Sequence, residues 1–183
     1  MKINIGVSNR HVHLNEETYN KLFPNKKIEK RNDLHQIGEF ASTDTVDITY
    51  NGRTINHVRV LGPFRKYNQV ELLESDLDYL ELSAPTRRSG DLNDTPGITI
   101  SNENNSVEIN SGVIRAERHV HVPTSMEDFL NLHERDTVKI TCKEVTFDAF
   151  VKVSDNGYFE VHIDKDEASE YGIENGDIGE IHV

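Results

Sequence analysis

Residues 10–14 read Arg-His-Val-His-Leu, and residues 118–122 read Arg-His-Val-His-Val. Two copies of so specific a stretch, in a chain with nine histidines, indicate an internal repeat. Alternate side chains of a β-strand point to the same face, so each copy presents two imidazoles side by side and turns its valine the other way. For a single copy, two exposed strand histidines would be the favoured interpretation. Two copies in matching contexts favour a transition-metal site.

The repeat extends beyond the histidines and predicts the fold. Each copy is followed by a short amphipathic helix and then by strands that correspond between the two halves. The matching segments are 45–49 with 137–141, 58–60 with 151–153, and 70–72 with 161–163. The repeat is too long and irregular for a solenoid. It predicts a mainly β protein made of two related small β-barrels capped by short α-helices.

Local signals give the expected elements more detail. Asn15 is a suitable N-cap for a helix that ends at Pro24. Asn51-Gly52 is a strong β-hairpin signal. Residues 26–33 are expected to form a charged connector, and residues 85–97 an irregular segment.

The repeat also has chemical content, because Glu71 in the first half corresponds to His162 in the second. Each half therefore offers three metal-ligand residues, which are His11, His13 and Glu71 in the first and His119, His121 and His162 in the second. Three protein ligands and an open position are typical of a catalytic zinc site, whereas structural sites are usually closed by four. Histidine and carboxylate also suit Co, Mn or Fe, so the residues alone leave the metal open.

Composition excludes several classes of function. The 183-residue chain has a net charge of −12, which argues against general affinity for nucleic acid or an anionic membrane. Cys142 is the single cysteine, so no internal disulfide forms, and its strand predicts a buried structural thiol. We find neither a signal peptide nor an apolar run of membrane-spanning length. We therefore expect a cytoplasmic protein.

Several motifs taken together resemble those of one family, the phosphate propanoyltransferases of the PduL type. The similarity runs along nearly the whole chain. It is carried by residues 6–14, 58–63, 69–71, 89–92, 96–98, 112–114, 118–121, 161–164 and 166–168.

The resemblance implies a phosphotransacylase, which exchanges acyl-CoA and phosphate for acyl phosphate and CoA. It implies two β-barrel domains, one over residues 10–116 and one over residues 117–183 completed by the N-terminal strand within residues 1–9. It also implies two zinc ions, one on each set of three ligands, and a homodimer. Arg65 matches the family's phosphate-binding arginine.

Other expectations follow from the resemblance and from the residues around it. Arg87 and Arg88 could help to hold the CoA phosphates or could be a surface charge pair. Only five residues precede the family core, so we expect a free cytoplasmic enzyme that is not encapsulated in a microcompartment. A free enzyme could act on acetyl-CoA as well as propanoyl-CoA.

No side chain stands out as a nucleophile, so we expect direct transfer within a ternary complex. Zinc would hold the CoA sulfur as thiolate and polarise the carbonyl group. Ser8 and Ser89 have no partner base that the sequence reveals.

Two other functions fit the same residues. One is a two-metal acyl-CoA hydrolase that uses a metal-bound water. The other is a non-catalytic metal- or CoA-binding module with structural metals. For Arg10 and Arg118 a structural ion pair and a substrate contact both stay open. The remaining histidines are expected to be ordinary surface or core residues, and they are His35, His57, His133 and His182.

Overall fold

The computed structural model describes residues 1–183, and the chain divides into two compact units. Unit 1 comprises residues 1–9, 35–37 and 117–183, and unit 2 comprises residues 10–34 and 38–116. Each unit is built around its own cluster of buried aliphatic side chains. We find no helix with the length and apolar character needed to cross a bilayer.

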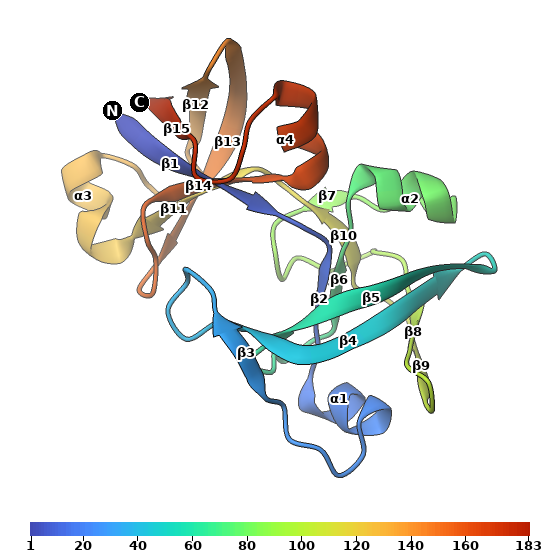
Figure 1. Cartoon of the computed structure of the whole chain (residues 1–183). Coiled ribbons are helices and arrows are strands. Elements are labelled where there is room, and N and C mark those ends of the chain that lie inside the picture. Colours follow the sequence, from blue (N-terminus) through green and yellow to red (C-terminus); the bar gives the residue numbers. More distant parts are fainter. The chain divides into compact units, whose positions relative to one another are not determined.

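Unit 1 contains a closed six-stranded barrel (Figure 1). Around the barrel the strands follow the order β1 (Lys2–Ser8), β14 (Glu160–Asp164), β11 (His119–Pro123), β13 (Val145–Ser154), β12 (Thr137–Cys142) and β15 (Ile178–His182). Strand β1 pairs in parallel with β14 and antiparallel with β15, so the N-terminal strand closes the barrel. Alternate residues of β1, among them Ile3 and Ile5, fill the interior.

Three short helical segments accompany this barrel, and they are η1 (Thr124–Met126), α3 (Glu127–Leu130) and α4 (Lys165–Tyr171). Helix α4 begins at a capping box in which Asp164 and Glu167 satisfy each other's backbone N–H groups. It ends at Gly172, whose φ of 65° is the left-handed conformation that glycine adopts without strain. These caps fix the first and last residues of α4, which follows β14 directly in the chain.

Unit 2 contains a nine-stranded sheet and two helices. The strand order is β7 (Thr86–Arg87), β10 (Val113–Ala116), β6 (Gln69–Glu71), β2 (His11–His13), β5 (Arg53–Gly62), β4 (Phe40–Tyr50), β8 (Ile98–Ser101) and β9 (Ser106–Ile109), with β3 (Lys30–Asp33) also paired to β4. The helices are α1 (Glu16–Leu22) and α2 (Glu74–Leu80). The long β4–β5 hairpin is prominent in Figure 1. Because β7 and β9 do not pair with each other, this sheet stays open.

The expected mainly β architecture with short helices is confirmed. Asn15 caps α1 by accepting a hydrogen bond from the Thr18 N–H at 2.8 Å. Asn51 and Gly52 join β4 to β5 with φ angles of 51° and 73°, as a type I′ turn requires.

Two local expectations are wrong. The charged connector contains β3, and the irregular segment contains β7. All four residues of β3 are exposed, so the strand has no buried face and no alternation of apolar and polar residues. Its conformation comes from backbone pairing with β4, and that of β7 from pairing with β10.

Candidate functional site

The two Arg-His-Val-His segments form equivalent strands in the two units. Strand β11 lies between β13, in parallel, and β14, antiparallel, and β2 lies between β5 and β6 with the same two directions. In unit 1 the register pairs His119 with His162 and His121 with Glu160. In unit 2 it pairs His11 with Glu71 and His13 with Gln69. Each unit therefore presents four positions in the same arrangement, three of which carry the predicted metal ligands.

The three histidines of unit 1 form a compact group. One ring nitrogen from each of His119, His121 and His162 lies within 4.8 Å of the others. The Nε2 atoms of His119 and His121 are 3.1 Å apart. Two nitrogens bound to one tetrahedral zinc at about 2.05 Å would be about 3.3 Å apart. The spacing of the nitrogens thus fits a single metal ion.

The surroundings of these rings also suit metal binding. His121 is buried, and desolvation, followed by the charges of His119, His162 and Lys152, lowers its pKa to about 2. The ring is therefore neutral at physiological pH, which is the form that binds a metal. The Nδ1 atom of His121 is buried and makes no hydrogen bond, so its desolvation is uncompensated, and a metal ion bound at this atom would satisfy it.

The orientation of His119 is set by a backbone group. Its Nδ1 lies 2.8 Å from the carbonyl oxygen of Glu117. When Nδ1 donates its proton to this carbonyl, the lone pair is left on Nε2, which faces His121. This is the tautomer that a metal ligand needs.

Unit 2 places its own three predicted ligands on the paired strands β2 and β6, but they do not form a group as compact as the three histidines of unit 1. His11 Nε2 lies 3.5 Å from Glu71 Oε2. The rings of His11 and His13 are 5.0 Å apart and nearly perpendicular. His13 is buried, whereas His11 and Glu71 are partly exposed. This set offers two nitrogens and a carboxylate, a donor set that zinc, manganese or iron accepts.

Arg65 lies next to β2, the strand of unit 2 that carries His11 and His13 and is called here the ligand strand of that unit. Its backbone N–H donates to the carbonyl of Leu14, the residue after β2, at 3.0 Å. Its guanidinium donates to the Tyr67 hydroxyl at 3.2 Å and pairs with the Glu39 carboxylate. The side chain is 27% exposed, so a small anion can reach it.

The loop that follows β7 lies near the same residues. Gln69 accepts a hydrogen bond from the Gly90 N–H at 2.8 Å and donates to the Ser89 hydroxyl at 3.1 Å. Arg87 is held within the loop by Asp91 and by the carbonyl of Asn93. Arg88 is half-buried.

The arginines that open the two motifs form matching ion pairs. Arg10 Nε lies 2.8 and 2.9 Å from the Asp76 carboxylate oxygens, and Arg118 Nε lies 3.7 Å from Glu167 Oε1. Asp76 and Glu167 both occupy the third position of the helix that follows β6 or β14. Each arginine therefore ties the ligand strand to the start of the neighbouring helix.

The structure adds residues that sequence reasoning missed around His162. Its Nε2 lies 2.9 Å from both Glu160 Oε1 and the Tyr158 hydroxyl, and its Nδ1 lies 3.3 Å from the Ser8 hydroxyl. Burial raises the pKa of Glu160, but hydrogen bonds and charge from His162 and His35 outweigh burial and lower the pKa overall. Alternation along β14 could have revealed Glu160, which is two residues before His162. Ser8 becomes visible only through the pairing of β1 with β14.

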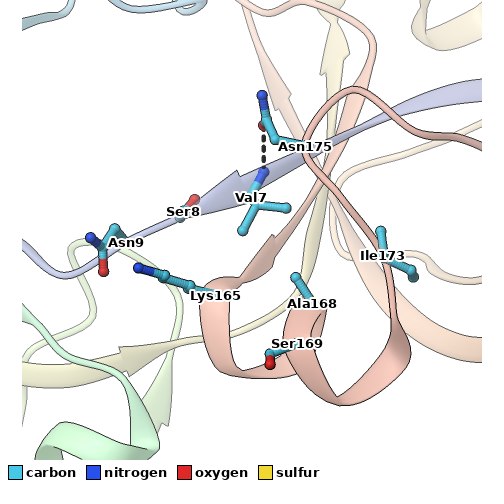
Figure 2. A pocket seen from close by; sticks show the side chains of 8 residues that line it. All are labelled: Val7, Ser8, Asn9, Lys165, Ala168, Ser169, Ile173 and Asn175. Atoms are coloured by element: carbon cyan, nitrogen blue, oxygen red, sulfur yellow. Dashed lines mark hydrogen bonds between the residues drawn. The ribbon is translucent and has the colours of Figure 1, made fainter.

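A pocket of about 340 Å³ lies in unit 1 between the end of β1 and α4 (Figure 2). Its walls combine apolar and polar side chains, and they are formed by Val7, Ser8, Asn9, Lys165, Ala168, Ser169, Ile173 and Asn175. Asn175 anchors one wall by accepting a hydrogen bond from the Val7 N–H at 2.9 Å. Ser8 links the pocket to the metal-ligand group because it also contacts His162.

Cys142 lies apart from these candidate ligands, on β12. The thiol is buried, and desolvation raises its pKa. A buried thiol with a raised pKa is a poor nucleophile. The prediction of a buried cysteine is confirmed.

Comparison with known proteins supports the resemblance found in the sequence. The phosphate propanoyltransferase family model matches residues 4–174. The chain is 39% identical to a phosphate propanoyltransferase of Limosilactobacillus reuteri, across 97% of this chain and 86% of that protein. It is 36% identical to those of Shewanella putrefaciens, across 95% and 85%, and of Salmonella typhimurium, across 94% and 85%. With a family match over most of its length and relatives aligned nearly end to end, the chain belongs to the phosphate propanoyltransferase family.

Proposed function

We propose that this protein is a phosphate acyltransferase that interconverts propanoyl-CoA or acetyl-CoA plus phosphate and the acyl phosphate plus CoA. We further propose that it binds two zinc ions, one on His119, His121 and His162 and one on His11, His13 and Glu71. Transfer is direct, without an acyl-enzyme. The observation that carries this proposal is the compact group of histidine nitrogens in a chain of this family.

The reaction exchanges one bond to the acyl carbon for another. A phosphate oxygen attacks the thioester carbonyl carbon, the carbon–sulfur bond breaks, and CoA leaves as a thiolate. No electron donor or acceptor is needed. Bound zinc would supply Lewis acidity, which stabilises a thiolate at neutral pH and polarises a carbonyl group.

Unit 1 has the features needed on the CoA side. In the pocket beside Ser8, the apolar side chains of Val7, Ala168 and Ile173 could contact the hydrocarbon parts of an acyl-CoA, and Lys165 adds one cation at the wall. Because Ser8 contacts both the pocket and His162, it would orient a bound thioester relative to the metal ligands.

Unit 2 has the features needed on the phosphate side. The planar guanidinium of Arg65 can hold two phosphate oxygens at once, which a lysine cannot. Phosphate would displace the Glu39 carboxylate, which pairs with the same guanidinium.

We also propose that Arg88 contributes to holding the phosphates of CoA, since it follows β7 in the loop that Gln69 supports.

The absence of a suitable nucleophile supports direct transfer. Cys142 is buried on β12. The Ser8 hydroxyl contacts His162, which would bind zinc and would then not serve as a base for the serine. The homodimeric state and the cytoplasmic location implied by the family resemblance are also part of this proposal. Light scattering after size-exclusion chromatography tests the first, and cell fractionation tests the second.

Three measurements test the finer parts of this proposal. Metal analysis of purified protein should give two zinc ions per chain, and a chelator should abolish activity that added zinc restores. Labelled CoA should exchange into propanoyl-CoA only when phosphate is present, because direct transfer needs both substrates. Exchange without phosphate would indicate an acyl-enzyme and contradict direct transfer.

A further inference from the structure

Glu160 is a buried carboxylate that the proposed reaction has not used. It lies on β14 two residues before His162, so both side chains point to the same face of the barrel wall. It is 7% exposed and lies opposite His121 in the register. A buried carboxylate is costly unless it is hydrogen-bonded to suitable donors.

The donors of Glu160 are histidine rings. His162 Nε2 lies 2.9 Å from Oε1, and His35 Nδ1, on the exposed side, lies 3.3 Å from Oε2. Tyr158 also lies 2.9 Å from His162 Nε2, but an ionised carboxylate is a stronger acceptor than a phenol oxygen. The proton on Nε2 of His162 therefore points to Glu160.

Strand β1 leaves room for this contact. Gly6 is the partner of His162 in the pairing of β1 with β14. A Cβ atom at residue 6 would lie 2.3 Å from Glu160 Oε1 and 2.7 Å from His162 Nε2, which is closer than real Cβ atoms approach. The carboxylate and the imidazole thus meet in a space that exists because residue 6 is glycine.

Glu160 does not belong to the compact group of candidate metal ligands. The group whose ligand atoms all lie within 4.8 Å of one another consists of three histidines, without Glu160. Its carboxylate therefore acts on the site through His162 rather than as an additional ligand.

Unit 2 provides an internal comparison. Gln69 occupies the position of Glu160, opposite His13, and is fully buried. Its amide contacts Ser89 and Gly90 rather than the ligand strand. The third ligand of unit 2 is Glu71, which has no ring N–H to satisfy. The position thus carries a carboxylate, Glu160, in unit 1, where the third predicted ligand is a histidine, and an amide, Gln69, in unit 2, where the third predicted ligand is a glutamate.

We infer that Glu160 is the positioning residue for His162. By accepting the Nε2 proton it fixes the tautomer and the orientation of the ring, leaves the lone pair on Nδ1, and strengthens metal binding by the unit 1 histidines. Carboxylates that hydrogen-bond to metal-binding histidines act in this way. The inference rests on the proposed zinc site of unit 1.

The direct test compares zinc affinity in the full-length wild type, Glu160→Gln and the control Glu180→Gln, by competition with a chromophoric chelator. His162→Ala identifies which binding step belongs to unit 1. Glu180 is a matched control because it is an exposed glutamate on β15 of the same barrel, opposite Lys2 and Thr141 rather than the histidines. Glu160→Gln should weaken zinc binding in unit 1 about 10- to 100-fold, and Glu180→Gln should leave it unchanged.

A spectroscopic measurement separates this role from simple destabilisation. Proton–nitrogen NMR of metal-free protein should show the Nε2-protonated tautomer of His162 in the wild type and its loss in Glu160→Gln. Unchanged zinc affinity and an unchanged tautomer in a folded Glu160→Gln variant would overturn the inference while leaving the zinc site intact. A wild type whose zinc binding is indifferent to His162→Ala would overturn the zinc site and the inference together.

Discussion

The chemistry of this protein depends on how individual side chains are partnered. The carbonyl of Glu117 and the carboxylate of Glu160 orient His119 and His162, and Leu14 holds the backbone of Arg65 beside the ligand strand of unit 2. None of these partners is itself a ligand. Substitutions at this scale should therefore separate binding of one substrate from stability of the fold.

Arg65→Lys should raise the KM for phosphate about 10- to 100-fold while changing the KM for acyl-CoA little. Lysine keeps the charge but loses the two-pronged contact, and a hydrogen bond between charged groups contributes about 1.5–3 kcal/mol. Initial rates over a range of phosphate concentrations measure the effect. Arg53→Lys is the control, because Arg53 pairs with Glu81 and the Tyr79 carbonyl at the other end of β5. An unchanged KM for phosphate in Arg65→Lys would remove this residue from the phosphate site.

Tyr19 predicts how stability depends on alkaline pH. Its ring is fully buried and its hydroxyl donates to Asp44 Oδ2 at 2.6 Å. Burial, followed by the hydrogen bond to Asp44 and its charge, raises the pKa of Tyr19 above its usual value of about 10. The folded state therefore keeps a proton that the unfolded state loses, so this contribution is complete below about pH 10 and is lost as the pH rises further.

The free energy of unfolding should accordingly fall by up to about 1.4 kcal/mol per pH unit more steeply in the wild type than in Tyr19→Phe above pH 10. Urea unfolding at pH 8, 10.5 and 11 measures the difference. Tyr79→Phe, at an exposed tyrosine, should follow the wild type. Equal slopes for the wild type and Tyr19→Phe would show that Tyr19 ionises normally in the folded protein.

At the scale of elements, the same strand arrangement appears twice, and unit 1 closes it with β1. The repeat was readable because corresponding strands keep similar residues in the two halves. The closure of the barrel by β1 was reached through the family resemblance, since pairing partners that are far apart in the chain leave no periodic signal. Strand β3 was missed for a related reason, because its exposed residues carry no pattern.

Ile5→Ala should lower the free energy of unfolding of unit 1 by about 2–5 kcal/mol, because it leaves a cavity in a closed core. Ile5 is 1% exposed and lies on β1 between β14 and β15. Urea unfolding monitored by circular dichroism measures the change. Lys2→Ala, at an exposed position of the same strand, should shift stability by less than about 0.5 kcal/mol. Equal small effects would mean that β1 does not contribute to the core.

For the whole molecule, the sequence predicted the candidate metal ligands, but the residues that hydrogen-bond to them could be identified only from the structure. Both sets of three predicted ligands follow from alternation on strands and from the correspondence of Glu71 with His162. Ser8 and His35 could not be assigned, because they reach His162 and Glu160 through contacts between distant parts of the chain. Local patterns reveal what shares a face, whereas contacts across strands depend on register.

The central claim is that zinc and phosphate act together on an acyl-CoA. The most direct test is phosphorus NMR of zinc-loaded protein mixed with propanoyl-CoA and phosphate, with released thiol measured in parallel. Acyl phosphate should form in step with free CoA, and neither should form without phosphate or after zinc is removed. Release of CoA and free propanoate without acyl phosphate would contradict the account and indicate a hydrolase.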